Sequence, residues 1–310
     1  MRTHQNLSLR QCIALKIMPD IRFFDAGDGG QPVLAVTGEL AQGLAALKPC
    51  GVILFRENLA SVAQCQALTT QLRECLGDET LIGIDQEGGR VTRLPRDATT
   101  SFSGNMALAA CPAVQREQLA AKVGAAQAQE LLALGINTNF VPSLDVNSNP
   151  QNPVIGVRSF GDDPQVVAEL GAALVGGMQS QGAAAAVKHF PGHGDTSQDS
   201  HTGLPCVDRS REDAMAIDLA PFRAVIADAA PAMVMTAHIQ YPSLDNSCLP
   251  GTDTVCPATL SRAMMTDLLR DEMAYQGVII TDAMDMQAIS ERLTPTDAVI
   301  ACFAAGVDIA

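Results

Sequence analysis

The chain has 310 residues, 47% of them hydrophobic, which is enough to bury a large core in one α/β domain or in two smaller ones. It carries a formal net charge of −14 and has a sequence pI of about 4.6. Because no Lys/Arg-rich run is visible, the composition argues against a nucleic-acid partner.

The cysteines and the apolar runs argue against a zinc or redox centre, a signal peptide and a membrane span. Nine cysteines are scattered without a CxxC pair, which argues against a zinc or redox centre and for free thiols in a reducing compartment. A bridge between Cys248 and Cys256 is the alternative. The N-terminal segment holds no apolar stretch long enough for a signal peptide, and no run of 18 apolar residues occurs. We therefore expect a cytoplasmic protein that does not enter a membrane.

Short β-branched runs alternate with amphipathic or alanine-rich segments along the chain. The runs predict eight strands, at residues 32–37, 52–55, 81–85, 137–142, 184–190, 233–238, 277–282 and 306–310. Helices are predicted between them, near residues 39–47, 61–76, 115–134, 163–180, 212–228, 259–273 and 295–305. Apolar strands that are each followed by a helix are typical of a parallel sheet covered on both faces. Eight of them favour a (β/α)8 TIM barrel, with an open doubly wound sheet as the alternative.

The last predicted strand coincides with the end of the sequence. The preceding helix begins Thr-Pro, a pattern typical of an N-cap followed by a proline in the first helical position. The eighth strand then ends at Ala310, so the outer ring of helices would lack its last member. We expect residues 1–310 to form a single barrel domain that is truncated after the eighth strand, with its C-terminal helix and any second domain absent.

Polar residues gather where the predicted strands end, which is where a parallel barrel carries its functional groups. The clusters are DQEGGRVTRL (85–94), NPVIGVRSFG (152–161), KHFPGHGDTSQDSH (188–201), TAH (236–238) and TDAMDM (281–286). The third cluster interleaves one Lys, three His and two Asp with Gly and Pro. Ordering such a loop costs conformational entropy, and a function would explain that cost.

Two chemistries fit these clusters. The first is metal-assisted hydrolysis, because the 188–201 loop offers the metal-capable side chains His189, His193, Asp195, Asp199 and His201. Against it, neither an HExxH nor a His-x-His pattern occurs, and Lys188 would place a positive charge beside the ion. The second is sugar hydrolysis, in which one carboxylate attacks carbon and another group handles the proton. We favour the second and expect no metal.

The motifs together resemble glycoside hydrolase family 3. DQEGGRVTRL, RSFG (158–161), the 188–201 cluster and IITDAMDM (279–286) carry the resemblance, and they are most similar to the β-N-acetylglucosaminidase branch. GVILFRENL (51–59) and LRQCIALKIMPDIRFF (9–24) also resemble it, so the match spans nearly the whole chain. The resemblance implies a TIM-barrel hydrolase that acts on small GlcNAc-terminated oligosaccharides and needs no cofactor.

The resemblance implies catalytic roles for Asp282, Asp199 and His201. Asp282 matches the nucleophile, and it follows an apolar strand that would bring its carboxylate to the barrel mouth. Asp285, three residues on, is a competitor that we interpret as a helix cap or a supporting group. Asp199 and His201 match a dyad in which the histidine is the general acid/base and the aspartate orients it.

Further matched positions imply contacts with the sugar, made by Asp85, Arg93, Arg158, Lys188 and His189. Charged hydrogen bonds of this kind are strong. His193 matches no role and is expected to pack or to hydrogen-bond within the loop, while His238 is expected to support the site without taking part in catalysis. The chain has two Tyr and no Trp, so little aromatic surface is available for stacking, which favours a small pocket over a long groove.

The leading hypothesis is a retaining exo-β-N-acetylglucosaminidase. It would hydrolyse terminal non-reducing GlcNAc from muropeptide sugars or short chitin oligosaccharides through a glycosyl-enzyme on Asp282. A phosphorylase is the close alternative, because a neutral histidine repels an incoming phosphate less than a carboxylate would. A non-catalytic sugar-binding barrel is the third hypothesis.

Overall fold

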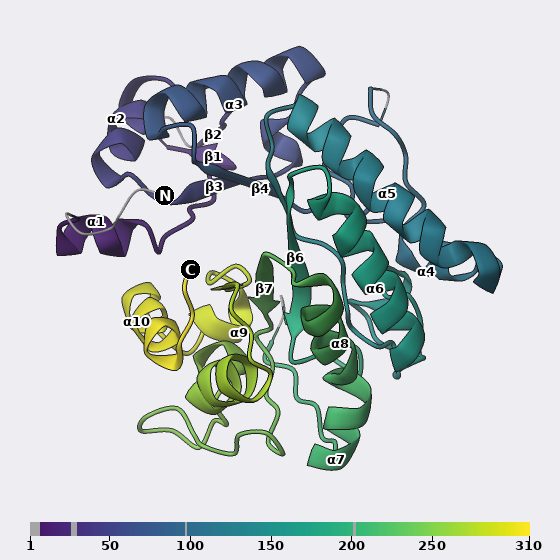
Figure 1. The fold of residues 1–310 in the computed structure, drawn as a ribbon. Coiled ribbons are helices and arrows are strands. Elements are labelled where there is room, and N and C mark those ends of the chain that lie inside the picture. The colour runs from purple at the N-terminus through teal and green to yellow at the C-terminus, as the bar shows by residue number, and fades with distance from the viewer. Residues whose placement is uncertain (1–6, 26–29, 97, 201–202) are drawn as a thin grey trace.

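A curled parallel sheet forms the centre of the molecule (Figure 1). The computed structural model describes residues 7–25, 30–96, 98–200 and 203–310. Six neighbouring strands pair in chain order, namely β3 (Gly51–Leu54), β4 (Leu81–Ile84), β5 (Thr138–Asn139), β6 (Ala184–Phe190), β7 (Met233–Thr236) and β8 (Val278–Ile280). All five pairings are parallel. The predicted parallel α/β architecture is therefore confirmed.

The first predicted strand, at residues 32–37, is wrong. Gln31–Pro32 forms β2, which pairs antiparallel with β1 (Phe23–Phe24) outside the parallel sheet. The rest of the apolar run leads into Thr37, the N-cap of helix α2 (Gly38–Leu47). In its place Asp20 bridges Ile53 of β3 in parallel. The sequence pattern missed this segment because Pro19, which has no N–H to donate, interrupts it.

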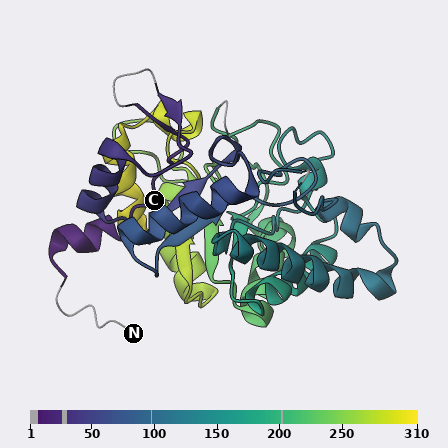
Figure 2. The same cartoon turned by 90° about the horizontal axis from the view of Figure 1, so that it is seen from above.

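The predicted eighth strand is reduced to a single bridge that nevertheless brings the two edges of the sheet together. Ile309 bridges Ile280 of β8 in parallel. The backbone N–H of Ala310 donates to the carbonyl of Lys16 at 2.9 Å, and the N–H of Met18 donates to the carbonyl of Ala310 at 2.9 Å. The purple N-terminal and yellow C-terminal segments accordingly lie on one side of the molecule (Figure 2). These bonds join the segment beside β3 to the segment beside β8.

Helices cover the outside of the sheet. The α-helices are α1 (Leu9–Ala14), α2, α3 (Val62–Leu76), α4 (Asn105–Ala109), α5 (Ala113–Ala133), α6 (Pro164–Gln179), α7 (Arg211–Asp213), α8 (Ala220–Ala229), α9 (Gln287–Ser290) and α10 (Pro295–Ala305). The predicted helix at 212–228 is divided into α7, a π-helical turn at Ala214–Asp218 and α8. The predicted helix at 259–273 is a 3-10 turn, Ala258–Leu260, followed by a π-helical segment, Ala263–Glu272. The Thr294 side chain caps α10, with Pro295 directly after it, as predicted.

Helices α5 and α6 pack so closely that their contact requires glycine. A Cβ added at Gly177 of α6 would lie 2.0 Å from the backbone oxygen of Ala121 in α5, and one added at Gly124 of α5 would lie 2.2 Å from the oxygen of Leu174 in α6. Gly176, the residue before Gly177, has open space at the same position. Of the two adjacent glycines in α6, Gly177 is therefore required for the contact with α5 and Gly176 is not.

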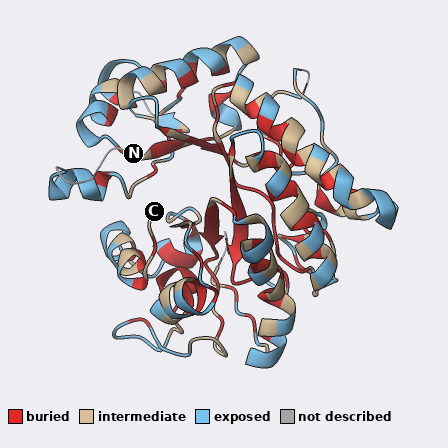
Figure 3. Ribbon diagram, viewed as in Figure 1, coloured by how far each residue is buried: buried red, intermediate tan, exposed pale blue. Residues whose placement is uncertain are grey.

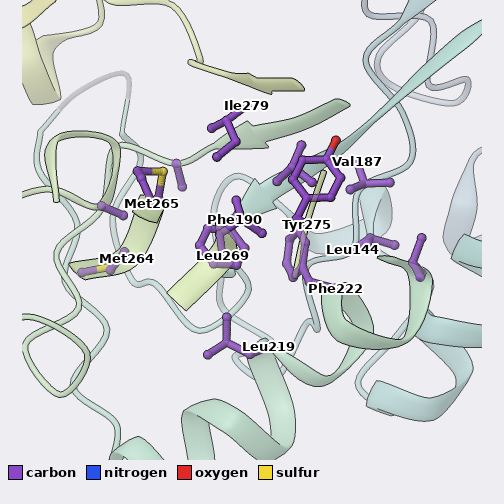
Figure 4. Packing of buried hydrophobic residues seen from close by; sticks show 14 of the residues in the cluster. Leu144, Val187, Phe190, Leu219, Phe222, Met264, Met265, Leu269, Tyr275 and Ile279 are labelled. Carbon is purple, nitrogen blue, oxygen red and sulfur yellow. The ribbon is translucent and has the colours of Figure 1, made fainter. Parts of the chain in front are cut away.

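The strands are buried on both faces (Figure 3). In β7, Val234 belongs to the large cluster between the sheet and the helices, whereas Met233 and Met235 belong to a smaller cluster with Phe140. This separation follows from the period-two alternation of side chains along a strand. Figure 4 shows part of the large cluster, where Phe190 and Phe222 meet edge to face with ring centroids 5.3 Å apart. The packed sheet fixes the strand ends from which the polar clusters project.

The described cysteines are free, so the alternative of a Cys248–Cys256 bridge is not realised. Burial raises the pKa of Cys256 to about 12, which keeps its thiol protonated. In the described ranges no helix combines the length and the hydropathy that crossing a membrane requires.

Candidate active site

A cavity of about 820 Å³ opens at the carboxyl ends of the strands. Its wall includes Asp85 after β4, Arg93 in the following loop and Asp282 after β8. Apolar side chains such as Phe140 and Met235 line it as well. The cavity therefore brings together residues from clusters that lie almost 200 positions apart in the sequence, and it has a size typical of small-molecule sites.

Lys188, at the end of β6, lies between two carboxylates. Its Nζ is 2.6 Å from Asp85 Oδ1 and 2.8 Å from Glu87 Oε1, and its side chain is only 2% exposed. Burial alone would lower the pKa of Lys188, but the charges of Asp85 and Glu87 outweigh burial and raise it. The ammonium group is therefore charged and held in one place.

Arg158 is held by the same glutamate. Its Nη2 and Nε donate to the two oxygens of Glu87 at 2.8 and 3.0 Å, which is the two-pronged geometry that suits a guanidinium and a carboxylate. Burial by itself would raise the pKa of Glu87, but Lys188 and Arg158 hold it far below its usual range. Glu87 was not among the predicted site residues, although it lies inside the DQEGG motif.

His189 is oriented from behind by another carboxylate that sequence analysis missed. Its Nδ1 lies 2.6 Å from Asp145 Oδ2, and its Nε2 lies 3.3 Å from Arg158 Nη2. The ring is therefore held in one orientation, with a carboxylate at Nδ1 and a guanidinium at Nε2. Asp145 is fully buried, and although burial opposes ionisation, its histidine neighbours lower its pKa. It follows β5 in the stretch FVPSLDV, where it is the one charged residue among mostly apolar neighbours.

Arg93 completes this side of the cavity. Its Nη2 is 3.8 Å from Asp85 Oδ2, and its guanidinium lies over the ring of Phe55, 5.6 Å from the ring centre. The buried Nε of Arg93 has no hydrogen-bond partner in the part of the chain that the structure describes. Four of the predicted sugar contacts thus form two directly contacting pairs, Asp85–Lys188 and Arg158–His189, which Glu87 joins. The fifth, Arg93, pairs with Asp85 at a longer distance.

Asp282 lies two residues after the end of β8 and is half-buried at the cavity wall. Its Oδ1 accepts a hydrogen bond from the backbone N–H of Ala283 at 2.8 Å. Burial alone would raise the pKa of Asp282, but the nearby imidazoles of His189 and His238, the Ala283 N–H and the Lys188 ammonium lower it. The carboxylate is therefore ionised at neutral pH.

Two further polar residues near Asp282 differ in burial: His238 is buried and Asp285 is exposed. The buried His238 ring contacts Thr259 Oγ1 at 2.8 Å and the carbonyl of Ala283 at 3.0 Å, which fits the predicted supporting role. Asp285 is exposed at the cavity wall. Helix α9 has Met286 as its N-cap, with no side-chain cap bond, so the interpretation of Asp285 as a helix cap is wrong.

The proposed dyad lies partly outside the described residues. Asp199 is half-buried in the loop after β6, and Ser200 is buried beside it. His201 falls in the undescribed segment 201–202. Asp195, earlier in the loop, pairs with Arg209 at 2.6 Å. Within the described ranges, no group of three or more His, Cys, Asp or Glu side chains is arranged to hold a metal ion.

Comparison with known proteins assigns the chain to a family. The model of the Glycosyl hydrolase family 3 N terminal domain matches residues 19–310. A curated relative, Beta-hexosaminidase A of Pseudoalteromonas piscicida, is 46% identical over 98% of this chain and 53% of its own length. The Beta-hexosaminidase of Hydrogenovibrio crunogenus is 37% identical over 84% of this chain and 70% of its own. The chain thus spans about half the length of the first of these relatives.

Solved structures agree with this assignment. A family 3 β-N-acetylglucosaminidase from Paenibacillus sp. str. FPU-7 superposes with a TM-score of 0.88 at 40% identity, covering 98% of this chain and 54% of that one. NagZ from Neisseria gonorrhoeae, in complex with N-trifluoroacetyl-D-glucosamine, gives a TM-score of 0.82 at 33% identity, covering 95% of this chain and 80% of that one. The chain belongs to glycoside hydrolase family 3.

Proposed function

We propose that this protein is a retaining exo-β-N-acetylglucosaminidase that hydrolyses terminal, non-reducing β-linked GlcNAc. The observation that carries the proposal is the ionised carboxylate of Asp282, which lines the same cavity as Asp85, the carboxylate paired with the buried Lys188 ammonium. The names of the similar proteins, β-hexosaminidases and β-N-acetylglucosaminidases, support the same sugar. In this proposal residues 1–310 form a single (β/α)8 catalytic domain that works in the cytoplasm.

In the proposed reaction, Asp282 attacks the anomeric carbon and forms a glycosyl-enzyme. An ionised carboxylate is needed for that attack, and the lowered pKa of Asp282 supplies it. His201, oriented by Asp199, gives a proton to the leaving oxygen and then takes one from the attacking water. Two successive displacements at one carbon return the original configuration, which is why the enzyme retains it.

The sugar would be held by Asp85, Arg93, Arg158, Lys188 and His189. Lys188 directs two of its three N–H groups to Asp85 and Glu87, which leaves a third for a sugar hydroxyl. The guanidinium of Arg93, at the wall of the cavity, offers further donors. Glu87 and Asp145 fix the cations and the imidazole without facing the sugar themselves. Because these charged groups are already fixed in place, little entropy is lost when the sugar binds. Their interaction with the sugar strengthens as charge develops on the sugar ring in the transition state.

The substrates we propose are muropeptide sugars and short chitin oligosaccharides. The cavity has Phe55 and Phe140 as its aromatic lining, and the chain lacks Trp altogether. Extended polysaccharide grooves depend on aromatic stacking, so the site is better suited to one terminal residue. A neutral His201 would repel an incoming phosphate less than a carboxylate would, so phosphorolysis is the alternative to hydrolysis. The two reactions give different products.

The test compares Asp282→Asn with Asp285→Asn on an aryl β-GlcNAc. Both carboxylates line the cavity and lie three residues apart, so the pair separates the nucleophile from nearby negative charge. We expect Asp282→Asn to lose roughly 10⁴-fold in kcat and Asp285→Asn far less. The wild-type product is expected to be GlcNAc both with and without phosphate. GlcNAc-1-phosphate would indicate phosphorolysis, and sugar binding without turnover would indicate a non-catalytic barrel.

A further inference from the structure

His193 is a buried polar side chain to which the proposed mechanism gives no role. It lies in the loop after β6, 2% exposed, and does not line the catalytic cavity. Its Nδ1 is 2.7 Å from Thr196 Oγ1, and its Nε2 is 3.1 Å from Ser200 Oγ. Its backbone N–H donates to Asp145 at 2.6 Å, the carboxylate that also orients His189. His193 therefore connects the sugar-binding group to the loop that carries Asp199.

The surroundings of His193 exclude proton transfer by its ring. Burial and the nearby His189 imidazole lower the pKa of His193 to about 4, so the ring is neutral at neutral pH. A neutral imidazole has one donor and one acceptor nitrogen. Thr196 and Ser200 occupy both of them. The ring thus has two structural partners and no free nitrogen for a substrate.

Ser200 is the partner that matters for catalysis, because it lies between Asp199 and His201. It is 3% exposed, and its side chain contacts His193. Its backbone carbonyl accepts from the N–H of Ala288 in α9 at 3.4 Å. Helix α9 follows β8 and Asp282 in the chain. Ser200 is therefore held from the β6 side through its hydroxyl and from the nucleophile's side through its carbonyl.

We propose that His193 and Ser200 form an anchor that positions the acid/base dyad relative to Asp282. His193 is a positioning residue in this proposal, since it acts through Ser200 and touches neither substrate nor reacting atoms. The proposal rests on the proposed function, in which Asp199 and His201 handle the proton. A misplaced dyad would weaken proton donation to the leaving group and leave the nucleophile and the sugar contacts intact.

The test is the dependence of kcat/KM on the leaving group in Ser200→Ala. This parameter reports the first, glycosylation step, in which a poor leaving group needs a proton and 2,4-dinitrophenolate does not. We expect Ser200→Ala to lose roughly tenfold on chitobiose, the effect of one hydrogen bond, and less than about twofold on 2,4-dinitrophenyl β-GlcNAc. His193→Ala should show the same selectivity with a larger loss, and His193→Gln, which can still reach Ser200, a smaller one.

The matched control is Ser261→Ala. Ser261 is also buried, and its hydroxyl donates to Asp245 and accepts from the backbone N–H of Met264, away from the cavity. It should affect both substrates equally. Equal losses on both substrates in Ser200→Ala, or no loss on either, would overturn the anchor. Wild-type protein that fails to cleave the dinitrophenyl glycoside would instead overturn the proposed function. If His193→Ala does not fold, Ser200→Ala and His193→Gln decide the question.

Discussion

Replacing Glu87 by Gln removes the negative charge that holds two cations in the site. Glu87 receives three charge-assisted contacts, at 2.8 Å from Lys188 and at 2.8 and 3.0 Å from Arg158. Glutamine has nearly the same shape, but it keeps one acceptor oxygen and places an N–H against a donor. Removing one partner of a buried ion pair typically costs about 3–5 kcal/mol, and we expect Glu87→Gln to lower the free energy of unfolding by that amount at pH 6.

The effect should depend on pH in a defined direction. The pKa of Glu87 in the folded protein lies far below its value in an unfolded chain, about 4.3. Its stabilisation is therefore complete above that value and is lost progressively as the pH falls below it. The difference between wild type and Glu87→Gln should shrink between pH 6 and pH 3, as measured by urea unfolding.

A surface glutamate provides the control. Glu272 also contacts two arginines, Arg211 at 3.7 Å and Arg223 at 3.1 Å, but its side chain is 45% exposed. Exposed ion pairs contribute about 1 kcal/mol or less, so Glu272→Gln should change stability little. Equal effects of the two substitutions, or a Glu87→Gln difference that does not change with pH, would refute the reasoning about the buried charge.

Four further substitutions test other parts of the molecule. Asp145→Asn leaves the Nδ1–H of His189 without its carboxylate and should lower kcat/KM roughly 10–100-fold in a folded protein; a change below twofold would contradict this. Burial raises the pKa of Asp218 to about 6, so ionising this carboxyl lowers the free energy of unfolding as the pH rises through 6. The free energy of unfolding of Asp218→Asn should therefore rise relative to wild type by about 2–3 kcal/mol between pH 4 and pH 7. A free-energy difference that stays constant with pH would contradict this prediction. Gly177→Ala should destabilise the protein by about 1–3 kcal/mol, because the added methyl group clashes with α5. Gly176→Ala, which has open space, should stabilise it by up to about 1 kcal/mol. A higher melting temperature for Gly177→Ala than for Gly176→Ala would refute the packing argument.

Much of the fold was predictable because buried parallel strands leave a strong pattern. The strands from β3 to β8 and most helices lie where apolar runs, caps and glycines predict them. The first strand was misplaced because a long apolar run leading into α2 outweighed a short one containing Pro19. Asp20 and Ile309 each join the sheet through a single bridge. Such bridges depend on contacts between the two ends of the chain, so the local sequence carries no pattern that predicts them.

The site was predictable to the extent that its residues follow strands. The structure brings Asp85, Lys188, Arg158 and His189 close together, and their roles toward a sugar stay predictions. Glu87 and Asp145 were missed because their role is to neutralise or orient other residues, and that role depends on three-dimensional partners far away in sequence. A buried carboxylate inside an apolar stretch, as in FVPSLDV, is the signal that would have pointed to Asp145, because such a group needs a partner.

Trapping the glycosyl-enzyme tests the central claim most directly. A fluorinated GlcNAc that forms the covalent intermediate quickly and releases it slowly should add one sugar to the wild-type protein, as measured by intact mass. Peptide mapping should then place that sugar on Asp282. A stoichiometric label on Asp285, on Asp85 or on any other residue would contradict the assignment of Asp282 as the nucleophile.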